Sequence, residues 1–143
     1  MRLTQFTDFA LRLLIYAAAH PDRLVTIEET AAAYDISRTH LTKVANLLAQ
    51  RGFLRSVRGR SGGLALARSP EQIGLGEVVR ATEPDFAIVE CFGTGDTCML
   101  TPSCRLKGIL GDALGAFLAE IDRHTLRDLV RDPPSFGIEQ PAA

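Results

Sequence analysis

Apolar side chains recur every three or four positions between residues 7 and 19, as expected for one buried face of a helix. The residues on that face are Phe9, Leu13, Tyr16 and Ala17. Thr7 is a candidate N-cap, and Pro21 follows the end of the pattern. We therefore predict a first helix over 7–19.

Two further helical patterns follow closely. One begins after Thr26 and runs to about Tyr34, with acidic residues in its first turn, where the positive end of the helix dipole favours them. The other covers 38–50 behind a candidate N-cap at Ser37, and Gly52 stands where a glycine commonly ends a helix. The turn between the two helices is short, which predicts a helix-turn-helix.

Residues 53–57 and 64–67 have the composition of two short strands, and the glycine-rich segment 58–63 between them predicts a tight turn. A hairpin directly after a helix-turn-helix is a wing. A fourth helix is predicted over 75–82, where Pro84 stops it. Residues 1–83 are thus expected to form one winged helix-turn-helix domain.

The rest of the chain has a different organisation. Residues 84–104 lack a periodic pattern, and Thr101 and Pro102 are expected to open a long helix that ends near Val130. Its apolar stripe is too long for the small domain to cover, namely Leu106, Leu110, Ala113, Phe117 and Ile121. We predict a dimerisation helix over 105–131 that packs on a second copy, and a disordered tail over 132–143. The expected fold class is mainly α with a small β-hairpin wing.

Composition changes this picture little. The chain is 46% hydrophobic and 23% charged, which is ordinary for a globular protein. The apolar run 13–19 is far too short to cross a membrane, so we expect a cytoplasmic protein with no membrane partner. Three cysteines cannot form a closed set of disulfides, so we interpret them as reduced thiols.

Charge is distributed unevenly, although the net charge is only −1. Seven of the 16 lysine and arginine residues lie between Ser37 and Arg68, and none of the 17 acidic residues does. This distribution predicts that the helix-turn-helix and wing face a polyanion, namely double-stranded DNA. The expected contacts are the first turns of the 38–50 helix, in the major groove, and the wing tip, in the minor groove: Arg38, Thr39, His40, Lys43, Arg58, Gly59, Arg60 and Ser61. Five or six phosphate contacts per subunit predict a log–log salt slope of about −9 to −11 for a dimer.

The three cysteines, Cys91, Cys98 and Cys104, are separated by six and five residues, with glycines between the first two. Such a loop can wrap one inorganic group, and Cys104 lies near the positive end of the predicted long helix, which favours an anionic cluster. Structural zinc sites usually have closer cysteine pairs and four ligands. The spacing alone leaves four alternatives: an iron–sulfur cluster, a thiol switch, zinc, and three inert cysteines.

Taken together, Met1 to about Val130 resembles the Rrf-type family of winged-helix iron–sulfur transcription regulators. The resemblance rests on four segments in the family's order, MRLTQFTDFALR, ISRTHLTKV, VRGRSGGL and the cysteine loop ending LTPSCRLK. It implies a homodimer that binds an imperfect palindrome, and a cluster whose state controls DNA affinity. A 4Fe–4S cluster is the expected cofactor, with a 2Fe–2S cluster as the alternative.

The resemblance also bears on the fourth cluster ligand. One subgroup has a histidine three residues after the last cysteine, where this chain has Lys107, which has no free lone pair. The nitric-oxide-sensing repressors use an aspartate of the first helix, contributed by the partner subunit, and Asp8 matches it. Arg12, one turn later, is expected to orient or neutralise that carboxylate. A carboxylate binds the iron of a thiolate-ligated cluster less firmly than a thiolate does. Nitric oxide is therefore expected to attack first at the iron that the carboxylate holds.

Three functions remain open: a nitric-oxide-responsive repressor, a sensor of iron or cluster supply, and a cluster-free thiol-redox switch. An enzyme is not expected, because the sequence has no phosphate-binding loop, no nucleophile–base pair and no second cofactor motif. The three histidines, His20, His40 and His124, are scattered and are interpreted as surface or capping residues.

Overall fold

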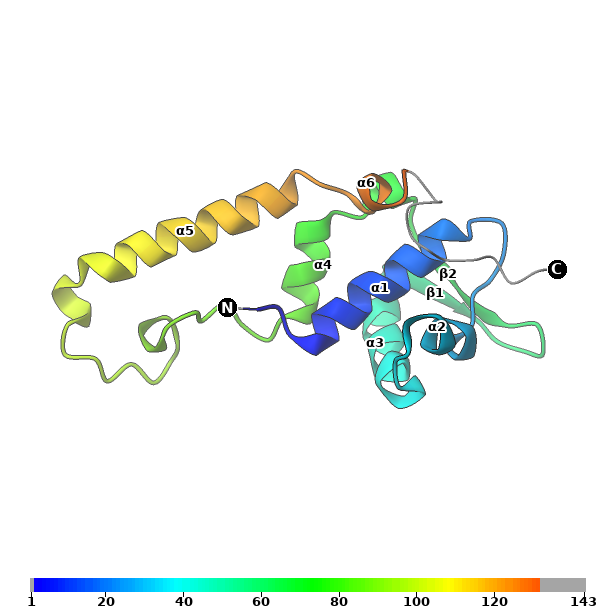
Figure 1. Ribbon diagram of the computed structural model, residues 1–143, viewed down its shortest axis with the longest axis horizontal. Helices are drawn as coiled ribbons and strands as arrows, with labels where there is room; N and C mark the ends of the chain where they lie inside the picture. Colours follow the sequence, from blue (N-terminus) through cyan, green and yellow to red (C-terminus); the bar gives the residue numbers. More distant parts are fainter. Residues whose placement is uncertain (1, 132–143) are drawn as a thin grey trace.

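A computed structural model describes residues 2–131 of the chain (Figure 1). It confirms the fold class, mainly α with one antiparallel hairpin. The predicted tail, 132–143, lies outside the described residues. Of the described helices, none is long and apolar enough to cross a membrane. The elements in chain order are α1 (Gln5–Ala19), α2 (Ile27–Tyr34), α3 (Arg38–Gln50), β1 (Leu54–Val57), β2 (Gly63–Leu66), η1 (Pro70–Gln72), α4 (Leu75–Thr82), η2 (Glu90–Phe92), η3 (Thr101–Ser103), α5 (Arg105–Asp122) and α6 (Leu126–Leu129).

Helix α1 is the centre of the core. Ala10, Leu13 and Leu14 are completely buried, and the helix contacts α2, α3, α4, α6 and strand β2. It begins two residues earlier than predicted, because Thr4 rather than Thr7 is the N-cap and accepts a hydrogen bond from the Thr7 amide (3.3 Å). Thr7 is instead buried, and its hydroxyl donates to the Thr82 hydroxyl of α4 (2.9 Å).

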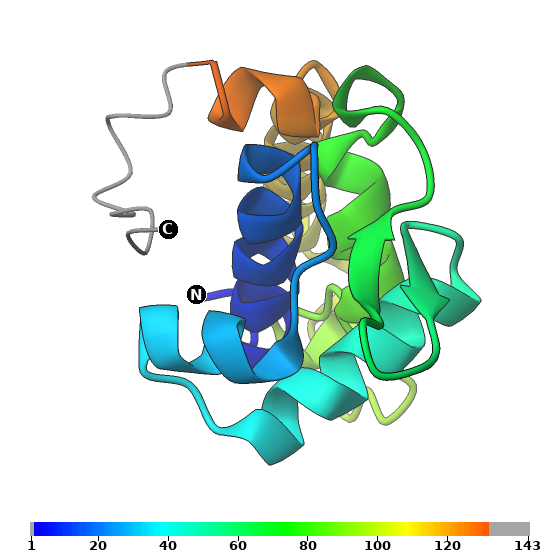
Figure 2. The same ribbon diagram turned by 90° about the vertical axis from the view of Figure 1, so that its right-hand side faces the viewer.

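The helix-turn-helix has the predicted bounds. Thr26 caps α2 by accepting a hydrogen bond from the Glu29 amide (3.1 Å), and Asp35 ends it in a left-handed conformation (φ 52°). Ser37 occupies the N-cap position of α3, but its side chain makes no capping hydrogen bond there. Figure 2 shows α2 and α3 side by side on one side of α1.

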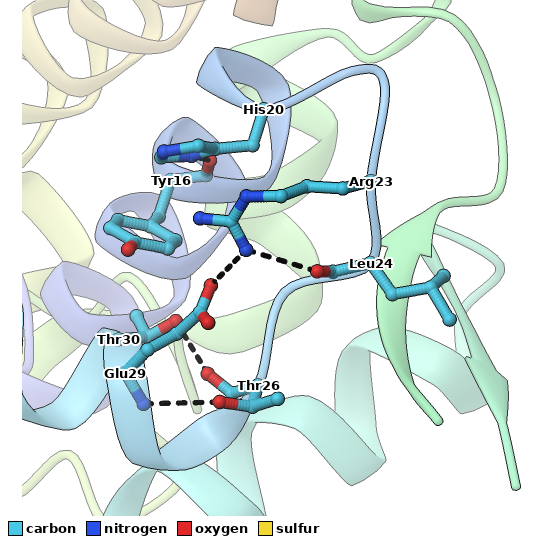
Figure 3. Close-up of polar contacts among 7 residues, drawn as sticks. All are labelled: Tyr16, His20, Arg23, Leu24, Thr26, Glu29 and Thr30. Atoms are coloured by element: carbon cyan, nitrogen blue, oxygen red, sulfur yellow. Dashed lines mark hydrogen bonds and ion pairs between the residues drawn. The ribbon is translucent and has the colours of Figure 1, made fainter. Parts of the chain in front are cut away.

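The wing is fastened to the segment between α1 and α2. Val25 forms a bridge with Leu64 of β2 through hydrogen bonds of 2.9 and 2.7 Å. Gly63 permits this approach, because a β-carbon there would lie 2.7 Å from the Val25 carbonyl oxygen. Beside the bridge, Arg23 donates to Glu29 (2.7 Å) and to the Leu24 carbonyl (3.1 Å), which ties this segment to α2 (Figure 3). The wing base therefore has a fixed position relative to the helix-turn-helix.

The C-terminal helix differs from the prediction at both ends. Thr101 and Pro102 form the short turn η3, and α5 begins at Arg105 with Cys104 as its N-cap. It ends at Asp122 rather than near Val130, because Thr125 and Asp128 form a capping box that opens α6. Leu126 and Val130 are buried in the core beside α1. Residues 126–130 thus complete the winged-helix core.

Helix α5 is attached to that core mainly through α4 (Figure 1). Arg80 of α4 donates two hydrogen bonds to Asp122, at 2.5 and 2.7 Å. Gly76 leaves room for this pair, since a β-carbon there would collide with the Asp122 carboxylate. Two hydrogen bonds from one guanidinium give the pair a defined geometry.

The Arg80 hydrogen bonds hold the pKa of Asp122 below its usual value of about 3.9. Since the folded-state pKa is the lower one, the stabilisation is complete above the unfolded-state pKa and is lost as pH falls through the folded-state pKa. We expect Asp122→Asn to lower Tm by about 1–4 °C at pH 7, and the difference from wild type to close between about pH 4 and 2. Thermal unfolding followed by circular dichroism measures both. Gly76→Ala places a β-carbon against the Asp122 carboxylate, so it is expected to disrupt the same pair and to show the same pH dependence as Asp122→Asn.

Candidate nucleic-acid interface and metal-ligand loop

The predicted reading residues of α3 all lie on its exposed side: Arg38, Thr39, His40 and Lys43. Leu41, Val44 and Leu48 are completely buried on the other side and fix the rotation of the helix. His40 also stacks on Phe9 of α1, with the ring centroids 6.2 Å apart. The first turns of α3 are therefore free to enter a groove while α1 supports them.

The wing tip is also exposed as predicted, at Arg58, Gly59, Arg60 and Ser61. Gly59 has a φ of 115°, which side-chain-bearing residues rarely adopt, and it accepts a hydrogen bond from the Gly62 amide (3.0 Å). At Gly62 a β-carbon would collide with the Val57 carbonyl oxygen. These glycines make a tight tip from which two arginines project.

Folding divides the seven basic residues of 37–68 into two groups. Arg68 supports the wing base: its guanidinium binds Glu77 (2.9 and 3.2 Å) and lies over the Phe53 ring, 5.0 Å from the centroid. Arg38 pairs with Glu28 (2.6 Å). The other five have no carboxylate partner within residues 2–131: Lys43, Arg51, Arg55, Arg58 and Arg60. Sequence counting did not reveal this division, because the two acidic partners lie outside the basic stretch.

The three cysteines are free thiols in or beside the loop between α4 and α5. Cys91 and Cys104 are half-buried, whereas Cys98 is exposed. Over residues 2–131, no group of three or more histidine, cysteine or acidic side chains has the arrangement of a metal site. The predicted ligands Cys91, Cys98, Cys104 and Asp8 are thus not brought together within one chain.

Hydrogen bonds that two carboxylates accept organise the cysteine loop. Glu90 accepts hydrogen bonds from the hydroxyl (2.7 Å) and the amide (3.2 Å) of Thr97, and the hydroxyl bond is the main reason why the pKa of Glu90 is lowered. Asp96 accepts from the Cys98 amide (3.0 Å), which lowers the pKa of Asp96. The Asp96–Cys98 contact is an Asx turn, in which an aspartate accepts from the amide two residues later, and Asp96 after Gly95 is the sequence signal that indicates it. The loop also borders a cavity of about 620 Å³, which Cys91 and Lys107 help to line.

Asp8 and Arg12 form the predicted pair on one face of α1, with a shortest distance of 2.9 Å. Both side chains are nearly half exposed. Arg12 also lies 6.0 Å from the centroid of the Tyr34 ring, so its guanidinium is held on two sides. Asp8 borders an open cavity of about 790 Å³ beside the start of α1. The carboxylate is therefore accessible from outside the chain, and its role as a cluster ligand remains a prediction.

The donor set has the chemistry that an iron–sulfur cluster requires. The three thiols lie outside the core, Cys91 in the short turn η2, Cys98 in the loop and Cys104 at the N-cap of α5, so they can approach one inorganic group without unfolding a long helix or a strand. An exposed carboxylate on α1 can supply a further, harder ligand. The residues present fit the group.

The histidines have no catalytic arrangement. His20 is buried at the end of α1, and its ring nitrogen lies 2.8 Å from the Tyr16 carbonyl oxygen, with the two rings tilted by 36° to each other (Figure 3). His124 lies beside Glu120 and Asp128 at the end of α5. His40 is on α3, remote in sequence from both. This agrees with their interpretation as capping and surface residues.

A winged helix with an exposed, basic recognition helix and wing defines a DNA-binding transcriptional regulator. The family model Rrf2, described as an iron-dependent transcriptional regulator, matches residues 3–132. The chain belongs to this family. It is 49% identical over 134 residues to the HTH-type transcriptional regulator NsrR of Bacillus subtilis, covering 92% of each chain.

Solved structures confirm the fold. IscR of T. potens is 20% identical, with a TM-score of 0.74, over 99% of this chain and 94% of that one. CymR, described as the global cysteine regulator of B. subtilis, is 22% identical, with a TM-score of 0.70, over 92% of this chain and 97% of that one. As its relatives are, this protein is a transcriptional regulator and not an enzyme.

The wing contacts are testable through salt dependence. Arg58→Gln and Arg60→Gln each remove one cation, so each is expected to make the log–log salt slope of DNA binding shallower by about 0.9 per subunit. The measurement is fluorescence anisotropy of a duplex that the wild-type protein selects from a randomised library. Arg123→Gln, at the exposed end of α5, removes the same charge and is expected to leave the slope unchanged. Equal slopes for wild type and both wing variants would contradict the wing assignment.

Proposed function

We propose that this protein is a homodimeric repressor that binds an imperfect palindromic operator, carries a 4Fe–4S cluster and releases DNA in response to nitric oxide. The observation that carries the proposal is the placement of three free thiols in and beside one loop outside the core, on a chain closely similar to a regulator named NsrR. The exposed reading residues of α3 and the wing support the DNA-binding part.

Cys91, Cys98 and Cys104 would hold the cluster, together with the partner subunit's Asp8. When bound, the cluster supplies iron atoms that react with nitric oxide. Arg12 would orient the Asp8 carboxylate through the ion pair that the chain already makes. Because the Asp8–Arg12 pair lies on the exposed side of α1, the carboxylate can reach a second chain without disturbing the core.

Asp8 lies close in the structure to the predicted recognition helix α3. Phe9, the next residue, stacks on His40 in α3, and α1 packs along α3. A ligand that crosses the dimer would tie each α1, and hence each α3, to the opposite sensor loop. Two recognition helices must be about 34 Å apart to enter successive turns of the major groove. Release of Asp8 would change that separation and weaken binding.

Helix α5 supports the homodimer. It has 18 residues, none of which is buried, and Leu106 and Ile109 are 59% and 62% exposed. The predicted stripe is divided by the fold, since Leu110, Phe117 and Ile121 are half-buried within the chain whereas Leu106 and Ile109 are exposed. Neighbouring large apolar side chains that are exposed to this degree often mark a contact surface. A second copy of α5 supplies the matching surface through a two-fold contact.

The dimer is testable by a charge on the exposed apolar face of α5 that includes Leu106 and Ile109. Ile109→Glu places a carboxylate in the proposed contact. Association would desolvate this charge at a large cost in free energy, so we expect the variant to sediment as a monomer. Ile109→Val keeps an apolar side chain and is expected to remain a dimer. Analytical ultracentrifugation of both variants and of the wild type measures the oligomeric state. A dimeric Ile109→Glu protein would show that this face of α5 is not the dimer contact.

The sensor is tested on anaerobically prepared protein. We expect about four irons and four sulfides per chain, and titration with nitric oxide is expected to weaken binding to the selected duplex by about tenfold or more. Loss of binding on iron chelation, but not with nitric oxide, would instead indicate a sensor of iron supply. A colourless protein that responds to thiol oxidation would indicate the redox switch, for which the exposed Cys98 is a suitable group.

The same assay tests the fourth ligand. Asp8→Ala is expected to lose the cluster faster in air, or to change its absorption spectrum, because one iron would lack its protein ligand. Asp112→Ala removes an exposed carboxylate from α5 and serves as the matched control. Identical spectra and decay rates for Asp8→Ala and wild type would remove Asp8 from the site.

A further inference from the structure

The first residue of the recognition helix is already engaged in the protein. Arg38 donates from one terminal nitrogen to Glu28 Oε1 at 2.6 Å, a contact across the turn of the helix-turn-helix. The Arg38 and Glu28 side chains are 69% and 60% exposed. The pair therefore lies on the surface that includes the reading residues of α3.

Arg38 differs in this respect from the other cations predicted to contact DNA. Lys43, Arg58 and Arg60 have no carboxylate partner among residues 2–131. Their full charge is available to any phosphate. Arg38 reaches DNA with a carboxylate beside it, and this carboxylate reduces the pull of phosphates on the guanidinium. Of these four cations, Arg38 therefore contributes the least electrostatic free energy to a contact with DNA phosphates.

Glu28 leaves the hydrogen-bonding capacity of Arg38 largely free. The carboxylate takes one terminal nitrogen, and the other two guanidinium nitrogens make no hydrogen bond within the described chain. A guanidinium reads guanine with two N–H donors, and a side chain held in place loses less freedom when it does so. The helix does not require Glu28 as a cap, because Thr26 caps α2 through the amide of Glu29.

We propose that Glu28 is a specificity-determining residue that acts through Arg38. It reduces non-specific attraction of the Arg38 guanidinium to phosphates and holds that guanidinium for contact with a base edge. The inference rests on the proposed DNA-binding face, but it does not depend on the cluster or on nitric oxide.

The test compares two DNA probes. The wild-type protein first selects one duplex from a randomised library. The duplex has about 30 base pairs, or about three turns of DNA. Affinities of each variant are then measured for this duplex and for poly(dI·dC). We expect Glu28→Gln to bind poly(dI·dC) about 3- to 10-fold more tightly, with a salt slope steeper by about 0.9 per subunit, and to gain nothing on the selected duplex. The ratio of the two affinities falls accordingly.

Two controls separate this role from a general effect of charge. Asp22→Asn removes an exposed carboxylate from the turn after α1 and is expected to leave the ratio unchanged. In an Arg38→Gln background, Glu28→Gln is expected to change the ratio by less than about twofold, because the group through which it acts is absent. Unchanged Tm values would show that each variant is folded.

Three results would overturn the proposal: an unchanged ratio in Glu28→Gln, the same change in Asp22→Asn, or the same change in the Arg38→Gln background. The last would mean that Glu28 repels phosphates directly. A wild-type protein that selects no sequence would instead contradict the proposed DNA-binding function itself. The two failures are therefore distinguishable.

Discussion

The burial of α1 is the constraint on which the rest of the structure depends. One helix has three completely buried apolar residues, Ala10, Leu13 and Leu14, and contacts α2, α3, α4, α6 and the wing strand β2. A close-packed core transmits a displacement because it has no free volume to absorb it. A displacement of α1 would therefore reach every element that α1 contacts, including α3 and the wing strand.

The molecule keeps its chemistry outside this core. The cysteine loop and the wing lie toward opposite ends of the chain's longest axis (Figure 1), and neither contributes a cysteine or a tip arginine to the interior. The packing of the core therefore does not depend on the cysteines or on the tip arginines. Helix α5, anchored by the Arg80–Asp122 pair and leading away from the loop, connects the two parts.

Charge is used selectively within the basic segment. Arg68 and Arg38 have acidic partners on α4 and α2, whereas the wing arginines have none in the described chain. A tip that is cationic and unpaired suits an electrostatic contact with phosphates, and a paired guanidinium suits recognition of a particular base. Glycines at the tip and at Gly63 allow the backbone geometry that places these arginines.

The sequence alone determined the local elements of the first 83 residues, because helical spacing, caps and glycines act within a few residues of one another. It also indicated the Asp8–Arg12 pair, which is one helical turn long. It did not predict the N-cap of α1 at Thr4, since the burial of Thr7 depends on its contact with Thr82, far along the chain. Nor did it predict that the long helix ends at Asp122, where the burial of Leu126 and Val130 favours a new start at Thr125. Which cations are paired, and which thiols stay apart within one chain, was decided only by tertiary structure, because charges and ligands act through space and not along the sequence.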